Sequence, residues 1–309
     1  MAELNENSVI LTRIRENINL AVRLPAELID NILICLCTSG HVLLEDMPGT
    51  GKTTLAKAVA NSIDAEFRRI QCVPDILPAD ITGINYFNQK EQEFIFRKGP
   101  VFANIVLADE INRASPRSQA ALLECMEERQ VTVDNVTHVL DAPFMVIATQ
   151  NPIETRGTFP LPEAQLDRFM MRLSLGYPER ETESEIIGMN LNNVPLKEIK
   201  PVANTAELLG VQAGLRDIKL SEPVRGYIAD IIRATRESGN IIIGASPRSG
   251  IALARAACAR ALIGGRSYAL PDDVKALAQP VLSHRIISEQ PPERILADII
   301  QKISAPVAE

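Results

Sequence analysis

A glycine-rich segment at residues 46–53 has the composition of a phosphate-binding loop. It reads Asp-Met-Pro-Gly-Thr-Gly-Lys-Thr, follows an apolar run and precedes a stretch with helical spacing. Glycines let backbone N–H groups approach a phosphate, a lysine supplies positive charge near the β- and γ-phosphates, and a threonine hydroxyl can ligate Mg²⁺. The segment therefore predicts a Walker A loop that binds ATP with Mg²⁺, although the strict pattern has glycine in place of Asp46. The residues expected at the nucleotide are Pro48, Gly49, Thr50, Gly51, Lys52, Thr53 and Thr54, with Thr53 as a metal ligand.

Two acidic residues, Asp109 and Glu110, end a later apolar run and predict a Walker B motif. A carboxylate at the carboxyl edge of a strand can hold Mg²⁺, partly through water, and we assign this role to Asp109. A second carboxylate can orient and deprotonate the attacking water, and we assign this role to Glu110. Two acids at a strand end are a weak signal alone, but a phosphate loop upstream of them indicates ATP hydrolysis.

Asn151 follows the next apolar run and adds a neutral amide to the same edge of the expected sheet. There it would share the attacking water or contact the γ-phosphate. The alternative is a plain turn former, because Asn-Pro pairs often begin loops.

The elements that must position these residues follow a βαβ rhythm. Apolar runs at 41–45, 67–70, 104–108 and 144–149 predict buried strands, and helical spacing appears at 52–63 and 116–128. This alternation is typical of an α/β fold with a parallel sheet.

Two segments, 84–96 and 130–140, break that rhythm and predict antiparallel β-hairpins inserted on the core. From about residue 178 the pattern predicts helices only, so we expect two domains, an α/β nucleotide-binding core at 1–177 and a helical lid at 178–309. The aromatic residues of the first hairpin are expected to pack in the core rather than to form a base-stacking platform; they are Tyr86, Phe87, Phe94 and Phe96.

Composition narrows the function. The chain has 309 residues with 32 Lys and Arg against 39 Asp and Glu, a formal net charge of −7, which argues against nucleic-acid binding through bulk charge. Its five cysteines lack metal-site spacing and predict buried free thiols in a reducing cytoplasm. The N-terminal segment lacks the features of a signal peptide, and no run is long enough to span a membrane, so we expect a soluble cytoplasmic protein.

Four segments, Pro48–Thr53, Asp109–Arg113, Ala148–Pro152 and Leu161–Phe169, together resemble the MoxR family of AAA+ ATPases. The resemblance spans nearly the whole chain and implies an AAA+ P-loop core with the hairpins of the helix-2-insert group, followed by a small all-helical lid. It also implies an oligomeric Mg-ATPase, commonly a hexameric ring in this family, that acts as a chaperone-like machine in remodelling or maturing client proteins. Such proteins often act beside a von Willebrand factor A-domain protein.

The resemblance also assigns arginine roles. In AAA+ proteins of this type an arginine reaches into the neighbouring subunit's nucleotide site, and Arg168 stands at the matching position as a trans arginine finger. A guanidinium there would stabilise charge on the transferring phosphoryl group. The alternative is an ion pair of Arg168 with Asp167 or Glu163. Arg156 is a rival for the finger role, and Arg113 is a further candidate at the subunit interface.

Residues 244–250 resemble the family's sensor 2 motif. Ser246 and Pro247 predict a helix start, which places Arg248 in the first turn. A cation there is disfavoured by the helix dipole by about 0.3–1 kcal/mol, so an outside anion is a good reason for its position. The resemblance implies that this anion is the γ-phosphate of ATP; the alternative is a surface arginine.

Two other functions stay open beside the remodelling ATPase. One is an ATP-gated binding switch with little hydrolysis, and the other is a nucleic-acid motor. The hairpin tips favour protein contact over nucleic acid, since Lys90 is accompanied by Glu91 and Glu93, and the second tip has no lysine.

Overall fold

The protein is described by a computed structural model that covers residues 2–47, 49–153, 157–191, 196 and 199–306. Within these ranges the core is a five-stranded parallel sheet in the order β2-β5-β8-β1-β9. The strands are β1 (Val42–Glu45), β2 (Phe67–Gln71), β5 (Ile105–Asp109), β8 (Met145–Gln150) and β9 (Met171–Leu173). The sheet, the hairpins and the helical lid confirm the fold class predicted from the sequence.

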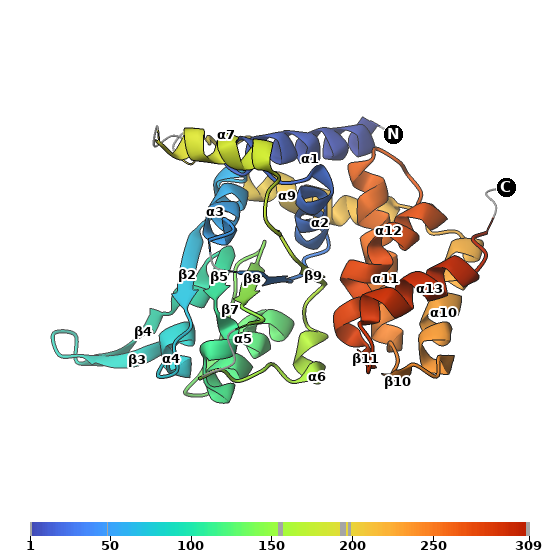
Figure 1. Cartoon of the computed structure of the whole chain (residues 1–309). Coiled ribbons are helices and arrows are strands. Elements are labelled where there is room, and N and C mark those ends of the chain that lie inside the picture. Colours follow the sequence, from blue (N-terminus) through green and yellow to red (C-terminus); the bar gives the residue numbers. More distant parts are fainter. Residues whose placement is uncertain (1, 48, 154–156, 192–195, 197–198, 307–309) are drawn as a thin grey trace.

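The sheet separates two apolar layers, because successive strand residues point to opposite faces. Ile105 and Leu107 belong to the layer under helices α2 (Ala26–Cys37) and α3 (Lys52–Ser62), whereas Val106 and Ala108 belong to the layer over α5 (Pro116–Glu128). Figure 1 shows these helices on opposite sides of the strands. With helices on both faces, the central strands are almost wholly apolar.

Two strand predictions need correction. The strand at 67–70 is only partly buried: β2 lies at the sheet edge, where Ile70 is buried and Arg68 and Arg69 are exposed. The sequence analysis also missed β9, which pairs with β1 at the opposite edge. Three residues are too short a run to show a strand period.

Both predicted hairpins are present. The first joins β3 (Gly83–Asn88) to β4 (Glu93–Lys98) after the short helix α4 (Pro78–Thr82), and projects from the edge of the molecule in Figure 1. The second joins β6 (Gln130–Val133) to β7 (Val136–Val139). The expected core packing of the first hairpin's aromatic residues is largely wrong: Phe94 is 72% exposed, and Tyr86 and Phe87 are also exposed. Phe96 is half-buried and stacks on His138, with ring centroids 4.0 Å apart.

The segment after the sheet is mainly helical. Its helices are α7 (Arg180–Leu191), α9 (Thr205–Gly214), α10 (Glu222–Glu237), α11 (Pro247–Ile263), α12 (Pro271–Leu282) and α13 (Pro292–Lys302), whereas the short helix α6 (Glu163–Leu166) lies earlier, between β8 and β9. The expectation of helices only is wrong, because β10 (Ile241–Ile243) pairs with β11 (Ile287–Ser288). These strands have two or three residues each and give no readable period.

Helix α1 (Ala2–Ala21) lies at the top of Figure 1 and belongs to the apolar layer of α2 and α3. It packs against α2, α3, α9 and α11, and α7 lies beside it, where Arg23 pairs with Glu185 at 3.5 Å. The boundary at residue 177 stays a prediction. Among the described helices, none combines the length and apolar character needed to cross a membrane.

Candidate nucleotide site

A pocket of about 450 Å³ opens at the carboxyl ends of β1, β5 and β8. This is the edge where ligands bind in parallel α/β sheets. Its described lining comprises Gly49, Gly51, Lys52, Thr53, Thr54, Arg69, Gln71, Asp109, Glu110 and Asn151. The fold therefore brings most of the expected Walker A residues, both Walker B acids and Asn151 around one cavity. Thr50 is not part of this lining, and its hydroxyl donates to the Met47 carbonyl oxygen at 3.3 Å.

The loop has the backbone that phosphate binding needs. Gly49 and Gly51 have φ values of 90° and 89°, a region that favours glycine. Gly51 begins α3 without a side-chain cap, so the first N–H groups of that helix are available to an anion. Lys52 Nζ donates to the carbonyl oxygens of Asp46 at 2.8 Å and Met47 at 3.2 Å.

Asp46, the departure from the strict loop pattern, has a separate role. The residue is only 5% exposed, and its carboxylate accepts hydrogen bonds from Ser174 Oγ at 2.8 Å and from the backbone N–H groups of Leu175 at 2.8 Å and Gly176 at 3.0 Å. The acid therefore anchors the start of the loop to the chain that leaves β9. This contact gives a physical reason for a carboxylate at position 46.

The two Walker B acids lie in a network of polar contacts. Asp109 Oδ1 accepts from Thr149 Oγ1 at 2.7 Å, and Asp109 Oδ2 accepts from Arg69 Nη2 at 2.6 Å. Glu110 Oε2 accepts from Gln71 Nε2 and from Arg113 Nη1, both at 3.2 Å. The contact of Arg113 with Glu110 lies within one chain; its expected interface role stays a prediction.

Glu110 has a left-handed backbone, with φ 58° and ψ 50°. A bulky residue there is strained by on the order of 1–3 kcal/mol. The Glu110 N–H donates to Thr149 Oγ1 at 2.8 Å, which holds the turn. Thr149 thus supports both acids, although the sequence analysis gave it no role.

Asn151 lines the pocket, and its Oδ1 also accepts from the Ile153 N–H at 3.2 Å. Asn151 therefore forms a turn, as the alternative expected, and also lies at the cavity. Pro48 and Arg156, two residues named from the sequence, lie outside the described residues.

The oxygen donors of the pocket fit a magnesium ion delivered with a nucleotide. The Asp109 carboxylate and the Thr53 hydroxyl line the same cavity. No group of three or more His, Cys, Asp or Glu that could hold a metal occurs among the described residues. Mg²⁺ characteristically uses one or two protein oxygens together with phosphate oxygens and water, so this small donor set suits it.

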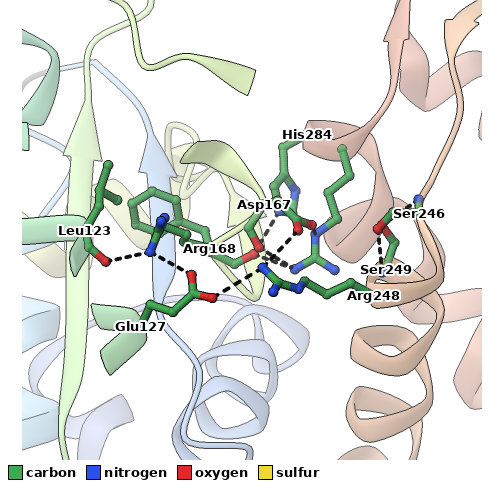
Figure 2. Close-up of polar contacts among 10 residues, drawn as sticks. Leu123, Glu127, Asp167, Arg168, Ser246, Arg248, Ser249 and His284 are labelled. Atoms are coloured by element: carbon green, nitrogen blue, oxygen red, sulfur yellow. Dashed lines mark hydrogen bonds and ion pairs between the residues drawn. The ribbon is translucent and has the colours of Figure 1, made fainter. Parts of the chain in front are cut away.

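The predicted arginines lie elsewhere, in a group that we call the arginine cluster: Glu127, Asp167, Arg168, Arg248 and Arg285 (Figure 2). Arg168 Nη1 pairs with Glu127 Oε2 at 2.6 Å and donates to the Leu123 carbonyl oxygen at 3.1 Å. The ion pair of Arg168 is thus with Glu127, rather than with the expected alternatives Asp167 or Glu163.

Arg248 lies where the sequence predicts it, at the start of α11. Ser246 caps α11 by accepting from the Ser249 N–H at 3.2 Å, and Arg248 follows in the first turn. Its anionic partners are Glu127 Oε1 at 3.4 Å and Asp167 Oδ2 at 3.9 Å. Within the described structure, neither Arg168 nor Arg248 belongs to the pocket lining.

Sequence reasoning also missed Arg69 and Gln71, which reach the pocket from β2. The spacing of Arg69 and Gln71 was a signal for a shared polar face, because residues two apart on a strand point to the same side of the sheet. Arg69 was hidden inside a strand that we expected to be buried, and Gln71 lies directly after the predicted end of that strand.

Comparison with known proteins agrees with this architecture. Residues 41–171 match the model of the ATPase family associated with various cellular activities (AAA), and residues 233–303 match the AAA lid domain. The first range contains the pocket residues, and the second contains Arg248.

Full-length similarities extend the match. The chain is 44% identical to the uncharacterized protein YeaC of Bacillus subtilis, over 89% of this chain and 88% of YeaC. It is 38% identical to chaperone MoxR1 of Mycobacterium tuberculosis, over 91% of this chain and 78% of MoxR1. A crystal structure of a protein from Cytophaga hutchinsonii with a provisional ATPase designation has a TM-score of 0.92 and 36% identity, covering 99% of this chain and 98% of that one.

Proposed function

Because the chain belongs to the AAA ATPases of MoxR type, a family whose membership implies ATP binding and hydrolysis, we propose that it is a Mg-dependent ATPase that works as an oligomeric remodelling machine. The observation that carries this proposal is the shared pocket of Lys52, Asp109, Glu110 and Asn151. A phosphate loop alone would only bind a nucleotide, whereas a second carboxylate beside it supplies a base for water.

The chemistry follows from the roles of these side chains. The loop N–H groups and Lys52 bind the phosphates, and Glu110 orients a water and accepts its proton during attack on the γ-phosphorus. The bond from the γ-phosphorus to the bridging oxygen breaks in this step, and ADP is the leaving group. Asn151 positions that water or the γ-phosphate. Thr53 and Asp109 would hold Mg²⁺, which would neutralise negative charge on the phosphates.

We further propose that the active form is a homo-oligomer, a hexameric ring in the simplest case. Arg168 would then act in trans, as the resemblance implies. Within its own chain Arg168 pairs with Glu127 and does not line the pocket, which supports a place at a subunit edge. A neighbouring subunit would supply the finger that each pocket lacks.

The client is proposed to be a protein or a protein complex. The name of the chaperone MoxR1 supports this class, and so do the exposed apolar side chains Phe87 and Phe94 on the projecting hairpin. A von Willebrand factor A-domain protein remains a candidate partner, and no nucleic acid or membrane partner is proposed. The buried free thiols support a reducing, cytoplasmic location.

Steady-state ATP hydrolysis with Mg²⁺, expressed per subunit over a wide range of protein concentration, tests the proposal when particle size is measured in parallel. We expect the rate per subunit to rise and saturate as the oligomer forms. A constant rate from a protein that remains monomeric would place the complete site within one chain. No hydrolysis at any concentration would reject the unassisted ATPase.

An ATP-gated binding switch with little hydrolysis is the second candidate. The contacts of Glu110 with Gln71 and Arg113 favour it, because they engage the carboxylate that would activate water. ATP binding without turnover in the assembled protein would support the switch.

A further inference from the structure

Arg69 brings a positive charge to the pocket that no motif accounts for. Its strand β2 lies at the sheet edge, and residues 67, 69 and 71 share one face. From that face Arg69 Nη2 donates to Asp109 Oδ2 at 2.6 Å and to Gln71 Oε1. Arg68 lies on the opposite face, where its Nε pairs with Glu66 at 2.8 Å.

The hydrogen bond from Arg69 engages Asp109, the carboxylate that is expected to hold Mg²⁺. Asp109 Oδ1 is engaged by the Thr149 hydroxyl, and Asp109 Oδ2 is engaged by Arg69. The Asp109 side chain is 14% exposed, so little further space surrounds it. A metal ion that uses Oδ2 must therefore replace the guanidinium.

The electrostatic need for such a cation is clear. The pocket must receive a polyanion beside two adjacent carboxylates, and an unpaired Asp109 would repel it. A charge-assisted hydrogen bond of 2.6 Å offsets that repulsion. The same pairing is unnecessary once Mg²⁺ neutralises the carboxylate.

We propose that Arg69 is a positioning residue that neutralises Asp109 and yields this carboxylate to Mg²⁺ when the metal arrives with the nucleotide. The inference rests on the proposed function, since it needs a nucleotide and a metal in this pocket. Gln71 connects this replacement of Arg69 by Mg²⁺ at Asp109 to Glu110, because its Oε1 accepts from Arg69 while its Nε2 donates to Glu110. Arg69 thereby sets how strongly nucleotide binding depends on the metal.

The test is equilibrium binding of ATP to the full chain in Mg²⁺ and in EDTA, with wild type, Arg69→Met and Arg69→Lys. We expect Arg69→Met to weaken binding in EDTA by about 10- to 100-fold, because Asp109 is then unpaired. In Mg²⁺ its affinity should change by less than about threefold, because the metal neutralises Asp109. Arg69→Lys should preserve the wild-type ratio of the two affinities, because the charge is retained.

Arg68→Met is the matched control, with the same change one residue away on the opposite face. It should leave both affinities unchanged, and thermal unfolding should verify that every variant is folded. An equal loss in both conditions for Arg69→Met, or no loss in either, would overturn the exchange. Absence of ATP binding to the wild type in both conditions would instead reject the proposed function.

Discussion

The phosphate pocket and the arginine cluster are built in different ways. The pocket takes its groups from one loop and from neighbouring strand ends, where register alone sets Gln71 opposite Asp109 and Leu44 opposite Thr149. The arginine cluster joins α5 and Asp167 of the core to Arg248 and Arg285 of the following helices. The geometry of the pocket is therefore local to the sheet, whereas the geometry of the cluster depends on how the helices pack against it.

The largest expected effect is that of Arg168→Ala, which tests whether the arginine cluster serves the pocket of a neighbouring subunit. If Arg168 is a finger, the variant should lose about 10³-fold or more in kcat while each pocket still binds ATP. Mixing it with Glu110→Gln should restore part of the activity, because each chain supplies the group that the other lacks. Steady-state hydrolysis of the two variants, separate and mixed, measures this.

Co-elution of the two variants in one particle is the control for the mixture. No recovery in a mixed particle would show that Arg168 and Glu110 act within the same chain. The cluster would then belong to the pocket of its own subunit.

Glu110→Gln tests the pocket side of the comparison. Loss of the base should lower kcat by about 10²- to 10⁴-fold, and the affinity for ATP should stay within about twofold, because the amide keeps the size of the side chain. Hydrolysis and equilibrium binding provide the two readouts. Glu128→Gln, an exposed change on α5, is the control; unchanged turnover in Glu110→Gln would remove the assignment.

Acid should destabilise the whole fold through two buried histidines, His41 and His284. Burial, with Arg129 nearby, lowers the pKa of His41 to about 3, and burial beside Arg285 does the same for His284. The unfolded chain takes up these protons below about pH 6.5, so stability present above that pH is lost as the pH falls towards 3. The expected loss is about 2–3 kcal/mol per histidine at pH 4.5.

Urea unfolding at pH 7 and pH 4.5 measures this loss. His284→Gln should reduce the difference between the two pH values by about 2–3 kcal/mol, because the lowered pKa of this buried imidazole is then absent. An undiminished difference in His284→Gln would contradict the role of this histidine.

The smallest expected effect is that of Glu127→Gln in the cluster. The side chains of Arg168 and Arg248 are 32% and 66% exposed, so solvent screens their pairs with Glu127. The free energy of unfolding should fall by about 1 kcal/mol or less, and the difference should shrink at high salt. A loss of several kcal/mol that is independent of salt would show that the cluster holds the helices to the core.

The sequence predicted the Walker residues of the pocket, but it did not predict the residues that contact them or the residues of the arginine cluster that pair across the chain. The Walker residues were recognisable because phosphate chemistry needs fixed residue types at fixed spacing, and the strands carrying them have clear apolar runs. Residues Arg69 and Gln71 were missed because the sheet order, which places β2 at an edge, is not written in the local pattern. Glu127 gave no signal at all, since its partners come from distant parts of the chain.

The hairpins show the same division. The period of β-forming residues predicted β3 and β4, but it could not show which faces would be covered. The exposure of Phe94 follows from where the hairpin projects, which is a tertiary property. The short strands β9, β10 and β11 failed for a simpler reason, because two or three residues hold no period.

The carboxylate of Asp46 ties the pocket to the start of the helical segment. Its hydrogen bonds fasten the first turn of the phosphate loop to the backbone at Leu175 and Gly176, where the chain departs for the helices. The loop and this exit are therefore linked twice, by the pairing of β1 with β9 and by the Asp46 side chain. We expect a displacement of the phosphate loop to be felt at Leu175 and Gly176, where the helical segment begins, by a route that does not pass through the arginine cluster.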